Sequence, residues 1–407
     1  MDIISTAAAL VVVLLALVTT STISKTLVPP AEHGRFLTID GLRGYLAVFV
    51  FLHHSYIWFQ YLRSGIWSAP ASKLFVHLGQ GGVALFFMIT GFLFFSKILD
   101  SRSTGVDWIR LYVSRFLRLT PLYIFSMLLL FIIVAIITYD QPVEPIEKIT
   151  TDALQWLTFT IAGAPDLNGL ERTIVVNAGV TWSLPYEWFF YASLPVLAIL
   201  VGVRTPKTTL LISAVSVVAF GIYYLQEEYQ WLFLGGMVAA ILVRSDKFTA
   251  LARNKWSSWV IVILLFYIVA RYPYLYTKTK PTYMLVVVFC LIAGGNTLFG
   301  VLSNRVSRSL GEMAYSIYLL HGIALYVLFR FVIGFPAARE FTVVQHWVVI
   351  AVLTPPLIIT CGLTFKFIEK IAMRNTDAVA ARIRSVISLF GGDKTLPRSQ
   401  ALKGPIS

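Results

Sequence analysis

The stretch IDGLRGYLAVFVFLHHSYIWF, residues 39–59, has the length and apolar character of a helix that crosses a membrane. It nevertheless contains Arg43 and two adjacent histidines, His53 and His54. Ionisable groups inside a bilayer are costly, and they usually face the protein interior, where they serve a function. The stretch therefore predicts a membrane helix that carries part of a functional site.

The composition of the whole chain supports this interpretation. Of its 407 residues, 57% are hydrophobic and 13% are charged, whereas about 25% are charged in a typical soluble domain. Apolar runs follow one another with short connections, which favours one bundle of membrane helices over several soluble domains. The two cysteines, Cys290 and Cys361, lie in apolar runs and indicate neither a disulfide framework nor a metal site.

Eleven membrane spans are expected from the apolar runs. The ranges are 3–23, 43–61, 80–98, 119–138, 179–200, 208–225, 230–243, 256–270, 282–299, 310–331 and 342–365. Several are slightly short for a hydrocarbon core about 30 Å thick, so their exact ends are approximate. The predicted fold class is all-α, a polytopic membrane bundle that interacts with the lipid bilayer on all sides.

The charge distribution predicts the orientation in the membrane. The net charge of +13 does not indicate nucleic acid as a partner, because the basic residues lie between the hydrophobic runs and mainly on alternate connections. If residues 25–43 are cytoplasmic, most of the 33 lysines and arginines fall on the cytoplasmic side. Basic residues follow the first run and do not precede it, which favours a retained helix over a signal peptide. We expect an outside N-terminus and a cytoplasmic C-terminus.

A long acidic segment is expected on the outer side after the fourth span, up to about residue 176. Connections of this length are often functional. A lid or docking surface for a substrate and a simple cap on the bundle are both compatible with it.

Helical geometry relates Arg43 to His54. Eleven residues make three turns plus about 20°, so both side chains share one face, about 16 Å apart along the axis. With Arg43 at the inner boundary, His54 falls near the middle of a core about 30 Å thick. His53 is rotated by about 80° from this line and is expected to pack or hydrogen-bond. His54 suits a base or an acyl carrier, and a neutral interhelical hydrogen bond is the alternative.

Other polar groups lie in apolar surroundings. Glu187, in TWSLPYEWFFY (181–191), could orient an imidazole as the carboxylate of a hydrolytic triad does, or it could pair with an arginine. Tyr318 and His321 are three residues apart and share a helix face. Arg115 and Arg118, in VSRFLRLTPLY (113–123), suit the phosphates of a soluble donor. Anchoring to lipid headgroups is the alternative for these arginines.

Taken together, the motifs resemble those of the acyltransferase-3 family of membrane O-acyltransferases. The similar segments, in chain order, are DGLRG with the Arg43–His54 spacing, LFFMITGFL, RFLRLTPLY, TWSLPYEWFFY, AYSIYLLH and FKFIEKIAMR. The resemblance extends over about residues 38–374. The chain departs from the family pattern at Ala84, where some members carry an acidic residue, and at Thr90, which replaces the usual serine.

The resemblance implies a ten-helix core, here residues 31–374, with an additional membrane helix in residues 1–30 and a basic cytoplasmic tail in residues 375–407. It also implies transfer of an acyl group, usually acetyl from acetyl-CoA, to a hydroxyl of an extracytoplasmic glycan such as O-antigen, capsule or exopolysaccharide. The implied location is the inner membrane of a bacterium. Acyl-CoA would be a substrate, and neither a tightly bound cofactor nor a metal ion is expected.

The resemblance also implies residue roles. His54 is then the catalytic histidine with Arg43 as its partner, and Arg115 and Arg118 contact CoA, with Arg43 near its phosphates. We add Glu187 as a further catalytic candidate. The residues expected to line the acceptor side are Trp182, Ser183, Tyr318 and His321.

Two other functional classes stay open. A secondary transporter could use Arg43, His54 and Glu187 as a relay, although the inverted repeats common in transporters are not visible in this chain. A flippase-like component of a polysaccharide pathway is the other alternative. The sequence identifies neither the acceptor nor the oligomeric state.

Overall fold

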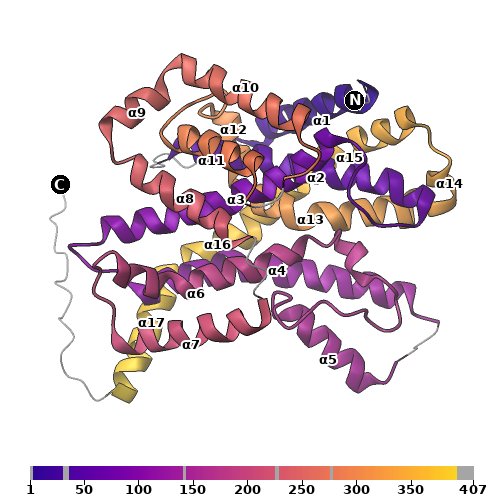
Figure 1. Ribbon diagram of the computed structural model, residues 1–407. Helices are drawn as coiled ribbons and strands as arrows, with labels where there is room; N and C mark the ends of the chain where they lie inside the picture. Colours follow the sequence, from indigo (N-terminus) through magenta and orange to yellow (C-terminus); the bar gives the residue numbers. More distant parts are fainter. Residues whose placement is uncertain (1–2, 31–35, 141–143, 225–228, 276–277, 392–407) are drawn as a thin grey trace, which may run out of the picture.

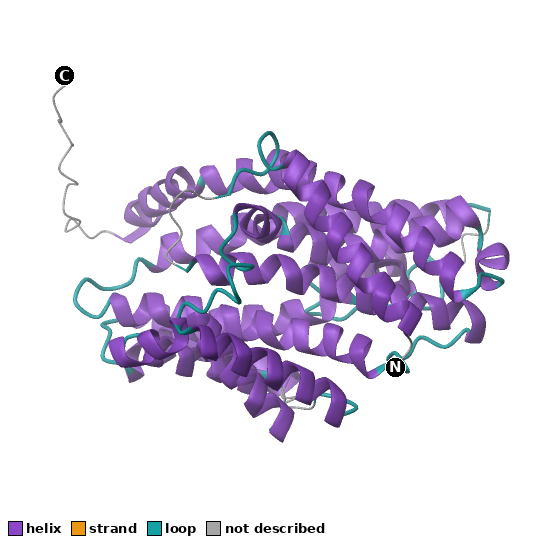
Figure 2. Ribbon diagram, turned by 90° about the horizontal axis from the view of Figure 1, so that it is seen from above, coloured by secondary structure: helices purple, strands orange, loops and turns teal. Residues whose placement is uncertain are grey.

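The computed structural model describes residues 3–30, 36–140, 144–224, 229–275 and 278–391 of the protein. Within these ranges the chain is helical and forms no strand, apart from an isolated bridge between Leu167 and Leu170. Figures 1 and 2 show one bundle in which many of the long helices run roughly parallel or antiparallel to one another.

The helices follow one another with mostly short connections. In chain order they are α1 (Ile3–Ile23), α2 (Leu37–Ser64), α3 (Lys73–Asp100), α4 (Trp108–Ile137), α5 (Ile146–Leu157), the 3₁₀ turns η1 (Thr173–Asn177) and η2 (Val180–Ser183), α6 (Leu184–Leu200), α7 (Lys207–Tyr224), α8 (Gln230–Leu242), α9 (Asp246–Arg253), α10 (Lys255–Arg271), α11 (Lys280–Ala293), α12 (Arg305–Glu312), α13 (Ala314–Val327), the π-helix η3 (Leu328–Ile333), α14 (Phe335–Arg339), α15 (Val343–Thr364), the π-helix η4 (Phe365–Glu369), α16 (Lys370–Arg374) and α17 (Thr376–Gly391).

The described part of the chain has five helical stretches long and apolar enough to cross a membrane: α1, α3, α4, α13 with η3, and the run from α15 into α17. Helices α9 and α10, bent by 72°, count as a sixth if they form one span, while α7, α8 and α11 are shorter apolar helices. Helix α2, with its arginines and histidines, is not among the five. Each of the eleven predicted ranges overlaps a helix, and the predicted fold class is confirmed.

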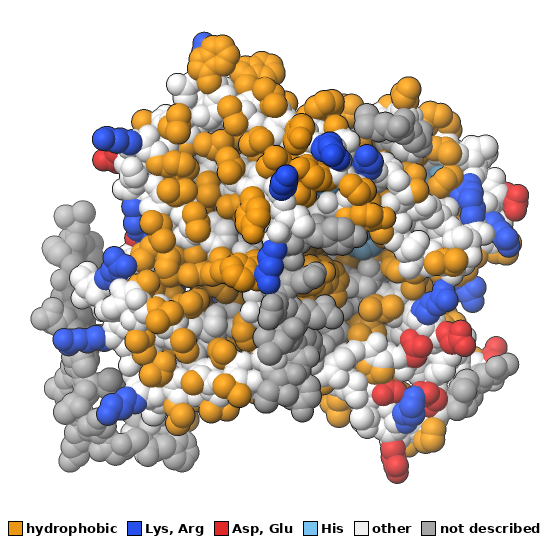
Figure 3. Space-filling model, viewed as in Figure 1, with side chains coloured by type: hydrophobic (Ala, Val, Ile, Leu, Met, Phe, Trp, Pro, Cys, Tyr) orange, Lys and Arg blue, Asp and Glu red, His pale blue; other side chains and the backbone are white. Residues whose placement is uncertain are grey.

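The surface agrees with a protein embedded in lipid. Figure 3 shows apolar side chains over much of one face, and acidic side chains gathered at the lower right, where Figure 1 places α5. At the other end of α4, two ion pairs hold the first turn of that helix to α17. The Nε atom of Arg110 lies 2.6 Å from Oδ1 of Asp377, and Arg384 pairs with Asp107. Helix α17, the described part of the basic tail, is therefore docked on the bundle.

The segment between α5 and α6 returns into the bundle. Its turns η1 and η2 bury Thr173, Val175, Val176, Asn177, Val180 and Thr181. Positive φ angles at Ala178 and Gly179, of 57° and 70°, break the path between the two turns. Non-helical backbone at membrane depth is tolerated where protein covers it. Gly322 of α13 permits this cover, since a Cβ there would lie 2.2 Å from the Asn177 carbonyl oxygen.

The path of the segment between α5 and α6 corrects one predicted helix boundary. The span expected at 179–200 begins as a helix only at Leu184, because residues 180–183 form the 3₁₀ turn η2. Pro185 occupies the first turn of α6, where its missing N–H costs nothing. Residues 180–183 therefore have 3₁₀ geometry in place of the α-helical geometry expected for the start of this span.

Helices α3 and α8 cross in close backbone contact. A Cβ on Gly236 of α8 would lie 2.0 Å from the carbonyl oxygen of Met88, and a Cβ on Gly91 of α3 would lie 2.3 Å from that of Phe233. Small residues at such crossings allow membrane helices to approach closely. The crossing fixes the position of α3, and with it one wall of each cavity described below.

We expect Gly236→Ala to destabilise the protein, because the new methyl group collides with backbone that cannot move independently of α3. The free energy of unfolding should fall by at least the ~1–3 kcal/mol typical of overpacking. A lower apparent midpoint of thermal unfolding in detergent checks this. Gly81→Ala is the matched control, since nothing lies within 4 Å of a Cβ at that helical position. Equal midpoints for the two variants would contradict the role given to the crossing.

Candidate active site

Among the described residues, one cavity is lined by His54 and another by Arg43. The histidine chamber, of about 230 Å³, is lined by Val50, His53, His54, Gly79, Gln80, Val83, Ala84, Trp182, Tyr229, Leu232, Leu275, Thr282 and Tyr318. The arginine chamber, of about 250 Å³, has as its polar lining Arg43, Thr90, Arg115, Arg118, Ser183, Glu187, Tyr191, Tyr315 and Tyr318. Val83 and Tyr318 belong to both walls. The chambers are therefore neighbours that share a partition.

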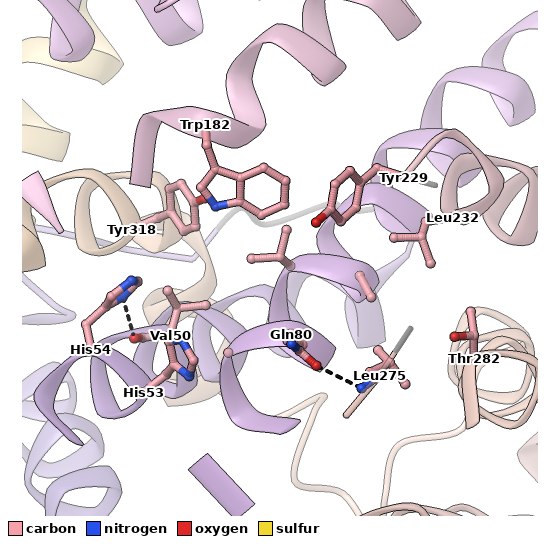
Figure 4. Close-up of a pocket in the computed structure, with 13 residues that line it drawn as sticks. Val50, His53, His54, Gln80, Trp182, Tyr229, Leu232, Leu275, Thr282 and Tyr318 are labelled. Atoms are coloured by element: carbon pink, nitrogen blue, oxygen red, sulfur yellow. Dashed lines mark hydrogen bonds between the residues drawn. The ribbon is translucent and has the colours of Figure 1, made fainter. Parts of the chain in front are cut away.

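Helix α2 carries both His54 and Arg43, and the two side chains line different chambers. This agrees with the expected separation along one helix face, because eleven residues advance the chain by about 16 Å. His54 lies at the wall of the histidine chamber beside Tyr318 (Figure 4). Its Nδ1 atom lies 3.1 Å from the carbonyl oxygen of Val50 and 3.0 Å from Nε2 of His321.

His53 makes a different set of contacts. Its Nδ1–H donates to the carbonyl oxygen of Phe75, at 2.7 Å. The ring packs so tightly on Gly79 of α3 that a Cβ there would lie 2.3 Å from the His53 Cγ. The expectation that His53 packs and hydrogen-bonds agrees with this geometry. His53 nevertheless also lines the histidine chamber, next to His54.

The arginine chamber concentrates positive charge. Arg43, Arg115 and Arg118 all line it, against the single carboxylate of Glu187. The guanidinium of Arg115 lies over the ring of Phe94, 5.2 Å from its centroid. Arg118 donates from Nη1 to the sulfur of Met373 at 3.3 Å, while its buried Nη2 has no hydrogen-bond partner among the described residues. A buried donor of this kind is costly unless a ligand accepts its hydrogen bond.

Glu187 lies in the arginine chamber and away from the histidines. Its Oε2 accepts a hydrogen bond from Tyr191 at 3.1 Å, and its Oε1 accepts a long one from Thr90 at 3.5 Å. The side chain within hydrogen-bond distance of His54 is instead that of His321, on α13. A catalytic role for Glu187 stays a prediction, and the geometry places any such role beside the arginines.

The four residues predicted for the acceptor side occupy different places. Trp182 lines the histidine chamber and Ser183 the arginine chamber. Tyr318 lines both; its hydroxyl donates to the Val180 carbonyl oxygen at 2.9 Å and accepts from Ser183 Oγ at 2.8 Å. His321 is fully buried and contacts His54. The structure thus brings Trp182, Tyr318 and His54 together, and acceptor binding by these residues stays a prediction.

The histidine chamber contains residues that sequence reasoning missed. Gln80 lines the same chamber as His53 and His54, and in Figure 4 its amide points toward Leu275, where its Oε1 accepts a hydrogen bond from the backbone N–H at 2.8 Å. Tyr229 packs against Trp182, with ring centroids 4.8 Å apart. The available signal for Gln80 was its position as a polar side chain at the start of an apolar run. Tyr229 lies just outside a predicted span and gave no comparable signal.

Neither chamber contains an arrangement of metal ligands. No group of three or more His, Cys, Asp or Glu side chains within the described ranges has the geometry to hold a metal ion. The described side chains of the two chambers offer proton transfer by imidazole and anion binding by guanidinium.

Comparison with known proteins agrees with this chemistry. No curated protein and no solved structure matches the chain. A family model, described as an acyltransferase domain, matches residues 36–365. That range begins just before α2 and ends with α15, so it contains every described residue of both chamber walls. The chain therefore belongs to the acyltransferase-3 family and is an integral-membrane acyltransferase.

Proposed function

We propose that the protein transfers an acetyl group from acetyl-CoA, bound from the cytoplasm, to a hydroxyl of an extracytoplasmic glycan. The observation that most supports this is the pair of neighbouring chambers with different chemistry. One is rich in arginine and the other contains two imidazoles and an indole, and they share Tyr318 and Val83. Two substrates with different chemical character, approaching from opposite sides, match this arrangement.

The arginine chamber suits the donor. A guanidinium forms charge-assisted hydrogen bonds with phosphate oxygens, and the buried Nη2 of Arg118 has no acceptor among the described residues. Acyl-CoA would supply such oxygens, with its thioester directed toward Tyr318. The arginine chamber lies near the basic first part of α4 and near α17, and basic segments favour the cytoplasmic side of a membrane. We therefore place this chamber on the cytoplasmic side. The N-terminus is then outside and the C-terminus inside.

The histidine chamber suits a sugar hydroxyl. Its described lining carries aromatic and neutral polar side chains around His54, and binding sites for small molecules typically combine such apolar walls with a few polar groups. Trp182 and Tyr229 offer aromatic faces, and Gln80 offers an amide. A terminal sugar unit of a surface glycan would reach His54 between Trp182 on one side and Gln80 on the other.

The chemistry requires one proton transfer in each direction. His54 takes the proton of the acceptor hydroxyl while the oxygen attacks the thioester carbonyl, which forms the ester C–O bond and breaks the C–S bond. The imidazolium then returns the proton to the departing CoA thiolate. The products are the acetylated glycan and free CoA, and the imidazole is restored.

Reconstituted protein provides the test. Purified protein in nanodiscs, which leave both faces accessible, should transfer label from acetyl-[¹⁴C]CoA to a glycan acceptor, and release one CoA for each ester formed. Mass spectrometry of the surface glycan with and without the gene should show a difference of one acetyl group. Hydrolysis of acetyl-CoA without ester formation, or no change in glycan mass, would contradict the proposal.

Replacing Trp182 should weaken acceptor binding. We expect Trp182→Ala to raise the acceptor KM about tenfold, which corresponds to ~1.4 kcal/mol, and to leave the KM for acetyl-CoA unchanged. Steady-state kinetics with each substrate varied in turn measures both values. Trp256→Ala removes an exposed tryptophan from α10 and serves as the control. A change in the KM for acetyl-CoA alone would mean that Trp182 serves the donor instead.

A further inference from the structure

A row of hydrogen-bonding atoms runs from the backbone of α13 through His321 to His54. The Nδ1 atom of His321 lies 2.8 Å from the carbonyl oxygen of Ile317, one turn earlier in α13. Its Nε2 atom lies 3.0 Å from Nδ1 of His54, and that same Nδ1 lies 3.1 Å from the carbonyl oxygen of Val50. The two imidazoles are 5.0 Å apart between centroids and inclined by 34°. Helices α2 and α13 are thereby joined through their histidines.

The acceptors in this row of atoms determine which ring nitrogens of His321 and His54 carry protons. A carbonyl oxygen can only accept, so the proton of neutral His321 lies on Nδ1 and its Nε2 is an acceptor. His54 Nδ1 faces two acceptors, the Val50 carbonyl oxygen and His321 Nε2, and it must therefore carry its own proton. The remaining nitrogen of His54, Nε2, then carries the lone pair. His321 is fully buried, which favours the neutral form of its ring.

We propose that His321 is a positioning residue that, together with the Val50 carbonyl oxygen, holds His54 in the Nδ1–H tautomer and fixes the orientation of its ring, with the basic Nε2 available to the acceptor hydroxyl in the histidine chamber. This inference rests on the proposed acetyl transfer and specifies which atom acts in it. A base is effective when a third group orients it, and the hydrogen bond at one ring nitrogen selects the tautomer. His321 performs here the orienting task that hydrolytic triads assign to a carboxylate.

The neutral His321 ring affects how the protonated form of His54 is stabilised. When His54 takes the hydroxyl proton, its Nδ1–H bond to His321 becomes charge-assisted and strengthens, because the donor is then cationic. No buried carboxylate is needed beside His54, and Glu187 remains with the arginines. His321 touches His54 and the residues around it without lining either chamber, so it acts through His54 and does not contact the substrate.

Two substitutions of His321 distinguish a role in positioning His54 from a role in packing α13. His321→Gln keeps an acceptor oxygen near the position of Nε2, whereas His321→Leu removes the acceptor and retains an apolar side chain in a site packed against Phe51 and Tyr318. We expect the leucine variant to lose kcat by about 10- to 100-fold, with the acceptor KM unchanged. The glutamine variant should recover most of kcat. Equal kcat values for the two variants, or a raised acceptor KM with kcat intact, would overturn the assignment.

A second measurement does not depend on turnover. Diethyl pyrocarbonate acylates an accessible, unprotonated imidazole nitrogen, and peptide mass spectrometry can follow its reaction at His54 without substrates. The rate should fall in His321→Leu and be retained in His321→Gln, and an unchanged rate in the leucine variant would overturn the positioning role. If the wild-type protein reacts in this way at His54 but transfers no acetyl group, the proposed function fails while the assignment of the tautomer stands.

Discussion

His54→Ala should reduce acetyl transfer by about 10⁴-fold, the upper part of the range contributed by a general base. The expected defect lies in kcat, because the imidazole acts on the proton of the hydroxyl and makes no contact in the arginine chamber. Isotope transfer from acetyl-CoA to the acceptor, measured in nanodiscs, gives the rate. Binding of acetyl-CoA, measured separately by equilibrium methods, should be unchanged.

The loss must be distinguished from a general effect of removing a buried histidine. His77→Gln is the control, since His77 lies on α3 outside both chambers, and glutamine can still donate to the Tyr272 carbonyl oxygen that now accepts from His77 Nε2 at 2.8 Å. This variant should behave as the wild type. Retained transfer in His54→Ala, at equal protein levels, would remove His54 from the mechanism.

Replacing Arg115 and Arg118, which lie within α4 beyond its first turn, should disable donor binding. We expect Arg115→Met combined with Arg118→Met to lower kcat/KM for acetyl-CoA by about 10²- to 10⁴-fold, because each charge-assisted hydrogen bond to a phosphate contributes ~1.5–3 kcal/mol. Methionine keeps the apolar stem of the side chain and removes the charge. The effect should appear in the KM for acetyl-CoA, and higher donor concentration should restore part of the rate.

Arg102→Met is the matched control for this pair, because Arg102 is exposed in the connection between α3 and α4. It should leave the donor KM unchanged. If the double variant and the control have the same KM for acetyl-CoA, the arginines serve only to anchor α4 in the membrane. A defect confined to the acceptor KM would mean that the roles of the two chambers are exchanged.

The features predicted best from the sequence are those encoded within one helix. The Arg43–His54 spacing places both residues in line on α2, and the structure opens a different chamber at each. His53 lies off that line and makes the hydrogen bond expected of it, to Phe75. Helical period and apolar length depend only on nearby residues, so they can be read without knowledge of the tertiary structure.

Contacts between helices could not be read in this way. His321 lies 267 positions from His54, and the register of α13 against α2 depends on packing that no local period records. Trp182 and Ser183 are neighbours in the chain but serve different chambers, because residues 180–183 form a 3₁₀ turn. Tertiary structure decided each of these points.

The partition made by Tyr318 and Val83 has a consequence for the cell. An enzyme that admits one substrate from each face of a membrane risks becoming a conduit for protons and other ions, which would dissipate the electrical potential that the membrane stores. Tyr318 lines both cavities, and its hydrogen bonds to Val180 and Ser183 hold its hydroxyl in place between them. In the proposed reaction only the acetyl group has to pass from the donor in the arginine chamber to the acceptor in the histidine chamber, so the two substrates need no common open channel.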